Sequence, residues 1–186
     1  PTTREKVLNA ALSLNYTPDA IARSLISNNT NIIAVIMQNT TNPFYAKVLT
    51  KLSIQLRKFG KQILYFYLDN PDNLQQMITQ VLQYRVDGIL ITSINLSSTI
   101  ADTCLNFGIP VVLFNRQINS SKIQSVCCDN FQAGRDCADY FVMKGHRRLA
   151  FIGGFDTAST TLKRKEGFLS RLRERGITAV TIYHSD

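Results

Sequence analysis

Polar and charged residues follow several short apolar runs of this sequence, where they could bind a ligand. They are residues 39–42, Ser93, Asn115 and Arg116, Asp129 and Asn130, and residues 156–164, with Phe44 and Tyr45 close to the first group. Hydroxyl, amide, carboxylate and guanidinium groups beside aromatic rings suit a small polar or polyhydroxylated solute that is hydrogen-bonded and stacked on a ring. For Ser93 and Asn130, capping of a helix is the simpler interpretation.

Of these residues, Arg164 is the one whose position most favours contact with a ligand. It falls outside the apolar stripe of a predicted helix over residues 160–175, in what we expect to be the first turn. A cation at that end opposes the helix dipole, so its position favours an anionic or oxygen-rich partner.

We expect no catalytic residues, no metal and no cofactor. The turn at residues 38–43 has no glycine for a phosphate loop, and no Gly-x-Ser-x-Gly motif occurs. The two histidines leave few candidates for a general base. The four cysteines, at 104, 127, 128 and 137, lack the two-residue spacing of metal or redox sites. We interpret them as buried thiols in a reducing compartment.

The composition is that of a globular protein with a diffuse positive charge. Of 186 residues, 45% are hydrophobic, and 21 Lys and Arg against 13 Asp and Glu give a formal net charge of +8. Because the basic residues are spread along the chain, they favour acidic partners in general without identifying DNA. No apolar run is long enough to cross a membrane and no secretory signal is visible, so we expect no membrane partner.

Apolar runs and helical patterns alternate along most of the chain. The runs predict strands at 32–37, 62–67, 88–92, 110–114, 125–128, 149–152 and 179–183, with helices over 44–59, 71–84, around 100–105, 131–144 and 160–175. Near-continuous apolar strands are typical of parallel sheets that are covered on both faces. The alternation predicts an α/β fold with a doubly wound parallel sheet, comprising one five-stranded lobe and the start of a second lobe.

Residues 1–30 depart from this alternation. The pattern predicts a helix over residues 3–14, capped by Thr2 or Thr3, and a short helix over 19–25 that Thr17 can cap. A polar linker over residues 27–31 then leads into the first strand.

Several stretches resemble the lactose/galactose-repressor (LacI/GalR) family of bacterial transcription regulators along essentially the whole chain. They are TREKVL at 3–8, NYTPDAIARSL at 15–25, TNIIAVI at 30–36, NPFYA at 42–46, RVDGI at 85–89, GIPVV at 108–112 and GHRRLAFIGG at 145–154. The resemblance implies a periplasmic-binding-protein-like core of two lobes, preceded by a DNA-binding headpiece and a hinge helix.

The resemblance divides the chain into four parts. Residues 1–15 correspond to the last headpiece helix, 16–30 to the hinge helix and linker, 31–130 to the N-terminal effector-binding lobe and 131–186 to the start of the C-terminal lobe. By this alignment the chain lacks the first headpiece helices and the C-terminal part of the core. Ala22 and Leu25 would contact operator DNA, with Leu25 as an apolar wedge in the minor groove. Ile54 would lie in a homodimer interface.

The resemblance also implies an effector crevice between the lobes. Its residues would be Thr40, Phe44, Tyr45, Asn115, Arg116, Asp129 and Arg164. Many relatives carry Asp where Asn115 stands, so this chain lacks one charge-assisted acceptor. The effector implied is a small polar molecule, a sugar or a sugar derivative.

Three classes of function remain open at this point. The favoured one is a cytoplasmic repressor-type regulator whose full-length form binds operator DNA. A solute-binding protein of a sugar uptake system would have the same fold, but it would begin with a signal peptide where residues 2–25 predict a capped helix and a hinge. An α/β enzyme is disfavoured by the missing catalytic set.

Overall fold

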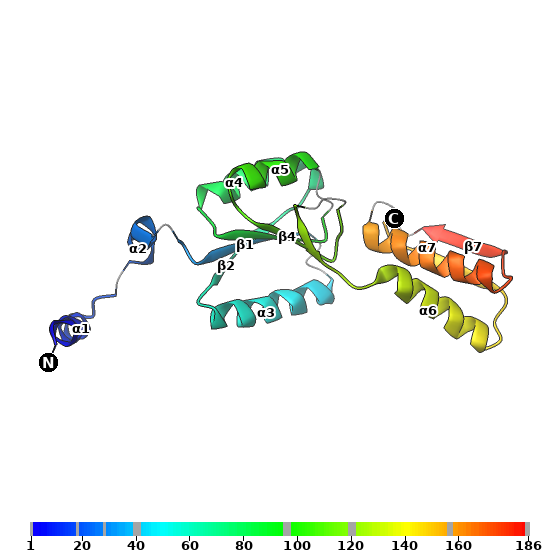
Figure 1. The fold of residues 1–186 in the computed structure, drawn as a ribbon, viewed down its shortest axis with the longest axis horizontal. Helices are drawn as coiled ribbons and strands as arrows, with labels where there is room; N and C mark the ends of the chain where they lie inside the picture. The colour runs from blue at the N-terminus through cyan, green and yellow to red at the C-terminus, as the bar shows by residue number, and fades with distance from the viewer. Residues whose placement is uncertain are drawn as a thin grey trace.

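The chain folds around two parallel β-sheets, which lie one after the other along the long axis of the molecule (Figure 1). The computed structural model describes residues 2–17, 19–27, 29–38, 42–94, 98–118, 122–155 and 158–184, without the side chains of residues 20, 21, 25, 27 and 98. The five-stranded sheet occupies the middle of the molecule and the two-stranded sheet one end, with two helices at the other end.

The first lobe is a five-stranded sheet in the order β2-β1-β3-β4-β5. Its strands are β1 (Ile32–Met37), β2 (Gln62–Tyr67), β3 (Gly88–Thr92), β4 (Val111–Phe114) and β5 (Gln124–Val126). Helix α3 (Pro43–Lys58) covers one face (Figure 1). The 3-10 turn η1 (Pro71–Asn73), helix α4 (Leu74–Gln83) and helix α5 (Ser98–Asn106) connect the strands, and α4 and α5 cover the other face.

The core of this lobe is formed by the central strands and the helices packed on them. Ile36, Ile91 and Leu113 are fully buried, and Ile78 of α4 packs into the same apolar cluster. The prediction that every strand is covered on both faces is wrong for the edge strands, since β2 is half exposed and β5 is exposed. An edge strand has a neighbour on one side only, so its apolar run is covered less completely than the same run at the centre.

The second lobe contains strands β6 (Leu149–Gly153) and β7 (Val180–His184) and helices α6 (Asn130–Met143) and α7 (Ser159–Glu174). Ala138, Phe168, Leu172 and Ile177 form its core. Coverage of both sheet faces is again a wrong prediction, because Ile152 and Tyr183 are 74% and 56% exposed.

Helices α6 and α7 pack closely through two glycines. A side-chain carbon at Gly134 would collide with the carbonyl oxygen of Arg164, and one at Gly167 with that of Phe131. Either glycine therefore permits an approach of the two helix backbones that any other residue would block.

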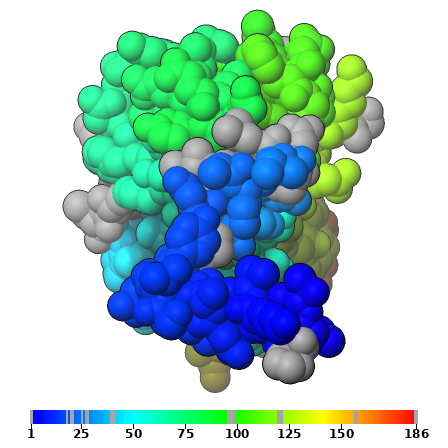
Figure 2. All heavy atoms as spheres, turned by 90° about the vertical axis from the view of Figure 1, so that its left-hand side faces the viewer, coloured from blue at the N-terminus to red at the C-terminus, as the bar shows by residue number. Residues whose placement is uncertain are grey.

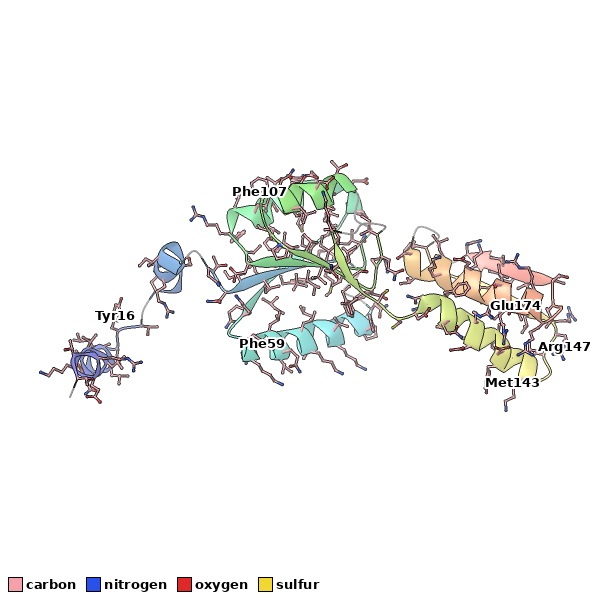
Figure 3. All side chains as sticks on the ribbon, in the orientation of Figure 1. Tyr16, Phe59, Phe107, Met143, Arg147 and Glu174 are labelled. Carbon is pink, nitrogen blue, oxygen red and sulfur yellow. The ribbon has the colours of Figure 1, made fainter. Side chains whose placement is uncertain are left out.

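Ion pairs join the middle of α6 to the C-terminal end of α7. Arg135 pairs with Glu174 at 2.6 Å between Nη1 and Oε1, and Arg171 bridges Asp139 and Glu174 at 2.8 and 2.7 Å. Hydrogen bonds from Arg135, and to a smaller extent from Arg171, lower the pKa of the Glu174 carboxyl to about 2. Figure 3 shows Glu174 at the end of the second lobe that points away from the first lobe.

Two helices precede the first lobe, α1 (Thr3–Ser13) and α2 (Ala20–Ser27). Of the two predicted caps of α1, Thr2 and Thr3, the structure has Thr2, which forms a capping box with Glu5. The predicted cap of α2 is wrong, because Asp19 and not Thr17 accepts the hydrogen bond from the Ala22 backbone N–H, at 3.3 Å. Figure 2 views the molecule from the side on which these helices lie, where α1 buries none of its side chains.

The linker from α2 to β1 is fastened to the first lobe by Asp87. The Asp87 carboxylate accepts hydrogen bonds from the backbone N–H and the hydroxyl of Thr30, at 3.0 and 3.1 Å, and pairs with Lys61 at 2.7 Å. Partial burial raises the pKa of Asp87, but the hydrogen bonds from Lys61 and Thr30 outweigh it and hold the pKa below its usual value.

The cysteines divide into buried and exposed ones. Cys104 is buried, and burial raises the pKa of its thiol. Cys127 is half-buried, whereas Cys128 and Cys137 are exposed, so the interpretation of all four as buried thiols is wrong for the last two. Strand β5 ends at Val126, which leaves Cys127 and Cys128 in the connection to the second lobe.

Candidate functional site

Arg116 lies where the carboxyl ends of the first-lobe strands meet the second lobe. Its Nη2 donates to the carbonyl of Ser93 after β3 at 3.0 Å, and its Nη1 to the carbonyl of Asn115 after β4 at 2.8 Å. The same Nη1 reaches the hydroxyl of Thr160, in the first turn of α7, at 3.5 Å. Because open α/β sheets bind ligands at this edge, Arg116 occupies the expected place for a ligand contact.

A second polar contact joins the lobes beside the first. The backbone N–H of Gln117 donates to the hydroxyl of Ser159 at 3.3 Å. Ser159 and Thr160 belong to the predicted polar segment 156–164, but their contacts with the first lobe could not be predicted before the opposite lobe was placed.

Asn115, Tyr45 and Phe44 form one wall of this region. Asn115 adopts a left-handed backbone conformation, with φ 59°, and its Nδ2 donates to the Tyr45 hydroxyl at 3.0 Å. Tyr45 is only 5% exposed, so its role in the structure is to hold Asn115. Phe44 is 47% exposed and stacks on Phe114, so it can offer a ring face to a ligand.

Arg164 and Asp129 meet at a different point, the start of α6. Arg164 Nε donates to the Asn130 side-chain oxygen at 2.8 Å, and Asn130 donates to the Cys128 carbonyl at 3.0 Å. Asp129 caps α6 by accepting from the Gln132 backbone N–H at 2.8 Å. Since α7 begins at Ser159, Arg164 lies in its second turn, and the prediction of a first-turn position is wrong.

Two hollows border these residues. One, of about 220 Å³, is lined by Gln38, Pro71, Ser93, Ile94, Arg116, Phe155 and Ala158. The other, of about 440 Å³, surrounds the start of α6 and is lined by residues that include Asp129, Asn130 and Lys163. The first is below the roughly 300–1,000 Å³ typical of drug-sized ligands, so it suits a small solute.

The predicted crevice residues thus form two groups that α7 connects. Phe44, Tyr45, Asn115 and Arg116 lie together at the ends of β1 and β4. Asp129 and Arg164 flank Asn130, which is 6% exposed. Thr160 touches the first group and Arg164 the second, one helical turn apart on α7. Thr40 lies outside the described residues.

The remaining predicted residues lie away from the crevice. Ala22 is exposed on α2, and the side chain of Leu25 is outside the described part of the structure. Ile54 is 54% exposed on α3, among the exposed residues Lys47, Lys51 and Lys58. Within the described ranges, no three His, Cys, Asp or Glu side chains gather as they would around a metal ion, and no helix is long and apolar enough to cross a membrane.

Comparison with known proteins gives one consistent family. Residues 29–185 match the family model described as "Periplasmic binding proteins and sugar binding domain of LacI family". Catabolite control protein A of Priestia megaterium is 30% identical over 179 residues, covering 95% of this chain and 54% of that protein. The sucrose operon repressor of Pediococcus pentosaceus is 31% identical over 178 residues, with 95% and 53% covered. The chain spans about half the length of the curated relatives it matches.

The fold also matches solved structures. The Cra transcriptional dual regulator from Pseudomonas putida, in complex with fructose 1-phosphate, superposes with a TM-score of 0.76 at 24% identity. The match covers 84% of this chain and 58% of that one. Both lobes therefore have the periplasmic-binding-protein-like fold that the sequence predicts.

Proposed function

The chain belongs to the family of periplasmic binding proteins and LacI sugar-binding domains, and from this premise we propose that it serves a repressor-type transcriptional regulator. Residues 31–130 and 131–186 form the N-terminal effector-binding lobe and the start of the C-terminal one. Residues 1–15 are the last helix of a DNA-binding headpiece, and 16–30 are the hinge helix and linker. The protein acts in the cytoplasm, where its operator DNA is, and it catalyses no reaction.

The observation that carries this proposal is the pair of helices in front of the sensor lobe. Helix α1 has a capping box and buries none of its side chains, so its apolar residues Val7, Leu8 and Leu12 are available to other parts of a headpiece. Relatives that align over 95% of this chain are named a catabolite control protein and a sucrose operon repressor. A solute-binding protein of an uptake system, the alternative, has no use for a hinge and a headpiece.

The effector in this proposal is a small polar molecule, a sugar or a sugar derivative, bound between the lobes. Phe44, Asn115 and Arg116 contact it from the first lobe, and Asp129 and Arg164 from the second, with Tyr45 and Thr40 completing the set. The hydrogen bonds from Arg116 to Thr160 and from Gln117 to Ser159 cross between the lobes at this place. A ligand that fits one lobe arrangement better than another shifts the population toward it.

The lobe arrangement acts on DNA through the linker and through a homodimer. Thr30 is held by Asp87, so movement of the first lobe carries the end of α2 with it. The hinge residues Ala22 and Leu25 then reach the minor groove only when two hinge helices meet. Ile54 lies in the dimer interface, and Ile54→Lys should convert the dimer to monomer in sedimentation; an unchanged dimer would exclude this role.

The test of the proposal is sequence-selective DNA binding by the whole protein. DNA fragments selected from a random pool should yield a shared site bound at about 10⁻⁸ M or tighter, and Leu25→Ser should weaken this binding. Arg173→Gln removes a charge far from the hinge and serves as the control. Binding of only 10⁻⁴–10⁻⁶ M that disappears with added salt would be non-specific and would contradict the proposal.

A further inference from the structure

We propose that the effector is an anion: a small polar solute whose phosphate or carboxylate group binds between Arg116 and Arg164. This inference rests on the proposed function, because it names the chemical class of the molecule that the crevice senses.

The first observation is the unbalanced charge of Arg116. Within the described residues, its hydrogen-bond acceptors are two backbone carbonyls and the Thr160 hydroxyl, all of which are neutral. Its Nε is buried and has no hydrogen-bond partner within the described residues. Burying such a donor is unfavourable unless a partner arrives, and an anionic oxygen is the strongest partner for a guanidinium.

Arg164 has a similar environment. Its one hydrogen bond within the described ranges goes to the neutral amide of Asn130. Two other basic residues of α7 pair with acids, Lys163 with Glu166 at 2.8 Å and Arg171 with Asp139 at 2.8 Å. Arg164 lies four residues after Thr160, on the same face of α7, so both guanidinium groups border one stretch of this helix.

The acceptors of the crevice are few or already occupied. Asp129, the one carboxylate among the predicted crevice residues, has an oxygen committed to the cap of α6. Asn115 offers an amide and not a carboxylate, and its Nδ2 donates to the Tyr45 hydroxyl. Among the described residues that line the 220 Å³ hollow, Arg116 is the charged one. A site that offers mainly donors and positive charge is suited to a ligand with negatively charged oxygens, since a neutral polyol would leave the charges uncompensated.

The test compares inorganic phosphate with chloride at equal ionic strength, and fructose 1-phosphate with fructose, by the unfolding midpoint of the whole protein. Phosphate at ten times its dissociation constant should raise the midpoint by about 3–6 °C. Fructose 1-phosphate should bind at least about tenfold more tightly than fructose.

Variants decide whether these two arginines are responsible. Arg116→Gln and Arg164→Gln should each reduce phosphate affinity by about tenfold or more, and the second keeps the test valid if the first fails to fold. Arg173→Gln is the matched control, since Arg173 is also on α7 but donates to the Leu169 carbonyl of its own helix. It should leave phosphate affinity unchanged, which distinguishes binding at a specific site from a general effect of the protein's net charge.

Three results would overturn the inference. They are no stabilisation by phosphate, the same stabilisation by phosphate in both arginine variants as in the parent, or fructose binding as tightly as fructose 1-phosphate. The last would leave the proposed sensor intact with a neutral effector. Failure of the regulator itself would be seen separately, as absence of sequence-selective DNA binding.

Discussion

The two lobes are built from the same strand–helix units, but different interactions hold them together. In the first lobe, helices cover both faces of a five-stranded sheet, and Ala34, Ile36 and Leu113 are fully buried. In the second, two helices pack on a two-stranded sheet whose outward residues Ile152 and Tyr183 are exposed. Its helix pair is joined by close glycine contacts and by arginine–carboxylate pairs. The first lobe therefore depends mainly on apolar burial, and the second more on close backbone packing and charge.

The largest effect should come from the core of the first lobe. Ile36→Ala should lower the free energy of unfolding by about 2–5 kcal/mol, because it leaves a cavity at a site with no exposed surface. Urea denaturation measures this change, and Gln55→Ala, at an exposed position of α3, should stay within about 0.5 kcal/mol of the parent. Similar losses for both variants would show that apolar burial does not dominate the stability of the first lobe.

A smaller effect, confined to the second lobe, should follow from Gly167→Ala. The new methyl group would collide with the Phe131 carbonyl and force α6 and α7 apart, at a cost of about 1–3 kcal/mol. Gly154→Ala is the control, since among the described residues only the Thr161 hydroxyl lies near its new carbon, at 3.6 Å. Hydrogen exchange should accelerate in α6 and α7 but not in β1 and β3. Uniform acceleration would mean that the two lobes unfold as one unit.

Asp87→Asn tests the main polar fastening of the first lobe. It removes the ion pair to Lys61 and weakens the bonds to Thr30, at an expected cost of about 1–2 kcal/mol. Backbone exchange at residues 29–31 should rise while the core of the lobe keeps its protection. Because the folded-state pKa of Asp87 is lowered, its contribution is present above the unfolded-state pKa and is lost as the pH falls through the folded-state value. Unchanged exchange in the linker would show that Asp87 does not fasten it.

The smallest effect we expect is a dependence of the stability of the second lobe on acidic pH, which comes from Glu174. The pKa of Glu174 is lowered to about 2, so its stabilising effect is complete above the usual glutamate pKa of 4.5 and is lost as the pH falls from there toward about 2. Thermal unfolding of Glu174→Gln should show a weaker dependence on pH in this window than the parent. The same dependence in both proteins would contradict the role of the arginine pairs.

The regular part of the fold could be predicted from the sequence because it depends on local patterns. The predicted strands 32–37, 62–67 and 88–92 have the observed bounds, since each is a continuous apolar run with polar residues or glycine at its ends. The predicted helix over 44–59 ends one residue early at Lys58, and Gly60 follows with φ 69°, a conformation that favours glycine.

What the sequence did not reveal depends on contacts between distant residues. The close approach of Gly134 to Arg164 and of Gly167 to Phe131 has no local signal in the sequence. A glycine inside a helical pattern indicates only a lower helix propensity. The partners of Arg116 and Arg164, Thr160 and Asn130, could be identified only after the lobes were placed. The exposure of Ile152 could not be predicted either, because an apolar run does not indicate which of its faces another element covers.

The crevice is the place where the two lobes act together, and Arg164 is the residue whose role most needs a direct measurement. Arg164→Lys retains the charge but loses the planar fork that binds adjacent oxygens, so effector affinity should fall about ten- to a hundredfold. Loss of the bond to Asn130 should lower the midpoint of the ligand-free protein by only about 1–5 °C.

Calorimetry on the whole protein, with the compound that stabilises it most in a screen of phosphosugars, sugar acids and neutral sugars, measures this directly. The account predicts a tenfold or greater loss of affinity in Arg164→Lys, with the ligand-free fold retained. An unaltered affinity would contradict the central claim that Arg164 contacts the effector, and a collapse of the ligand-free protein would make Arg164 a structural residue.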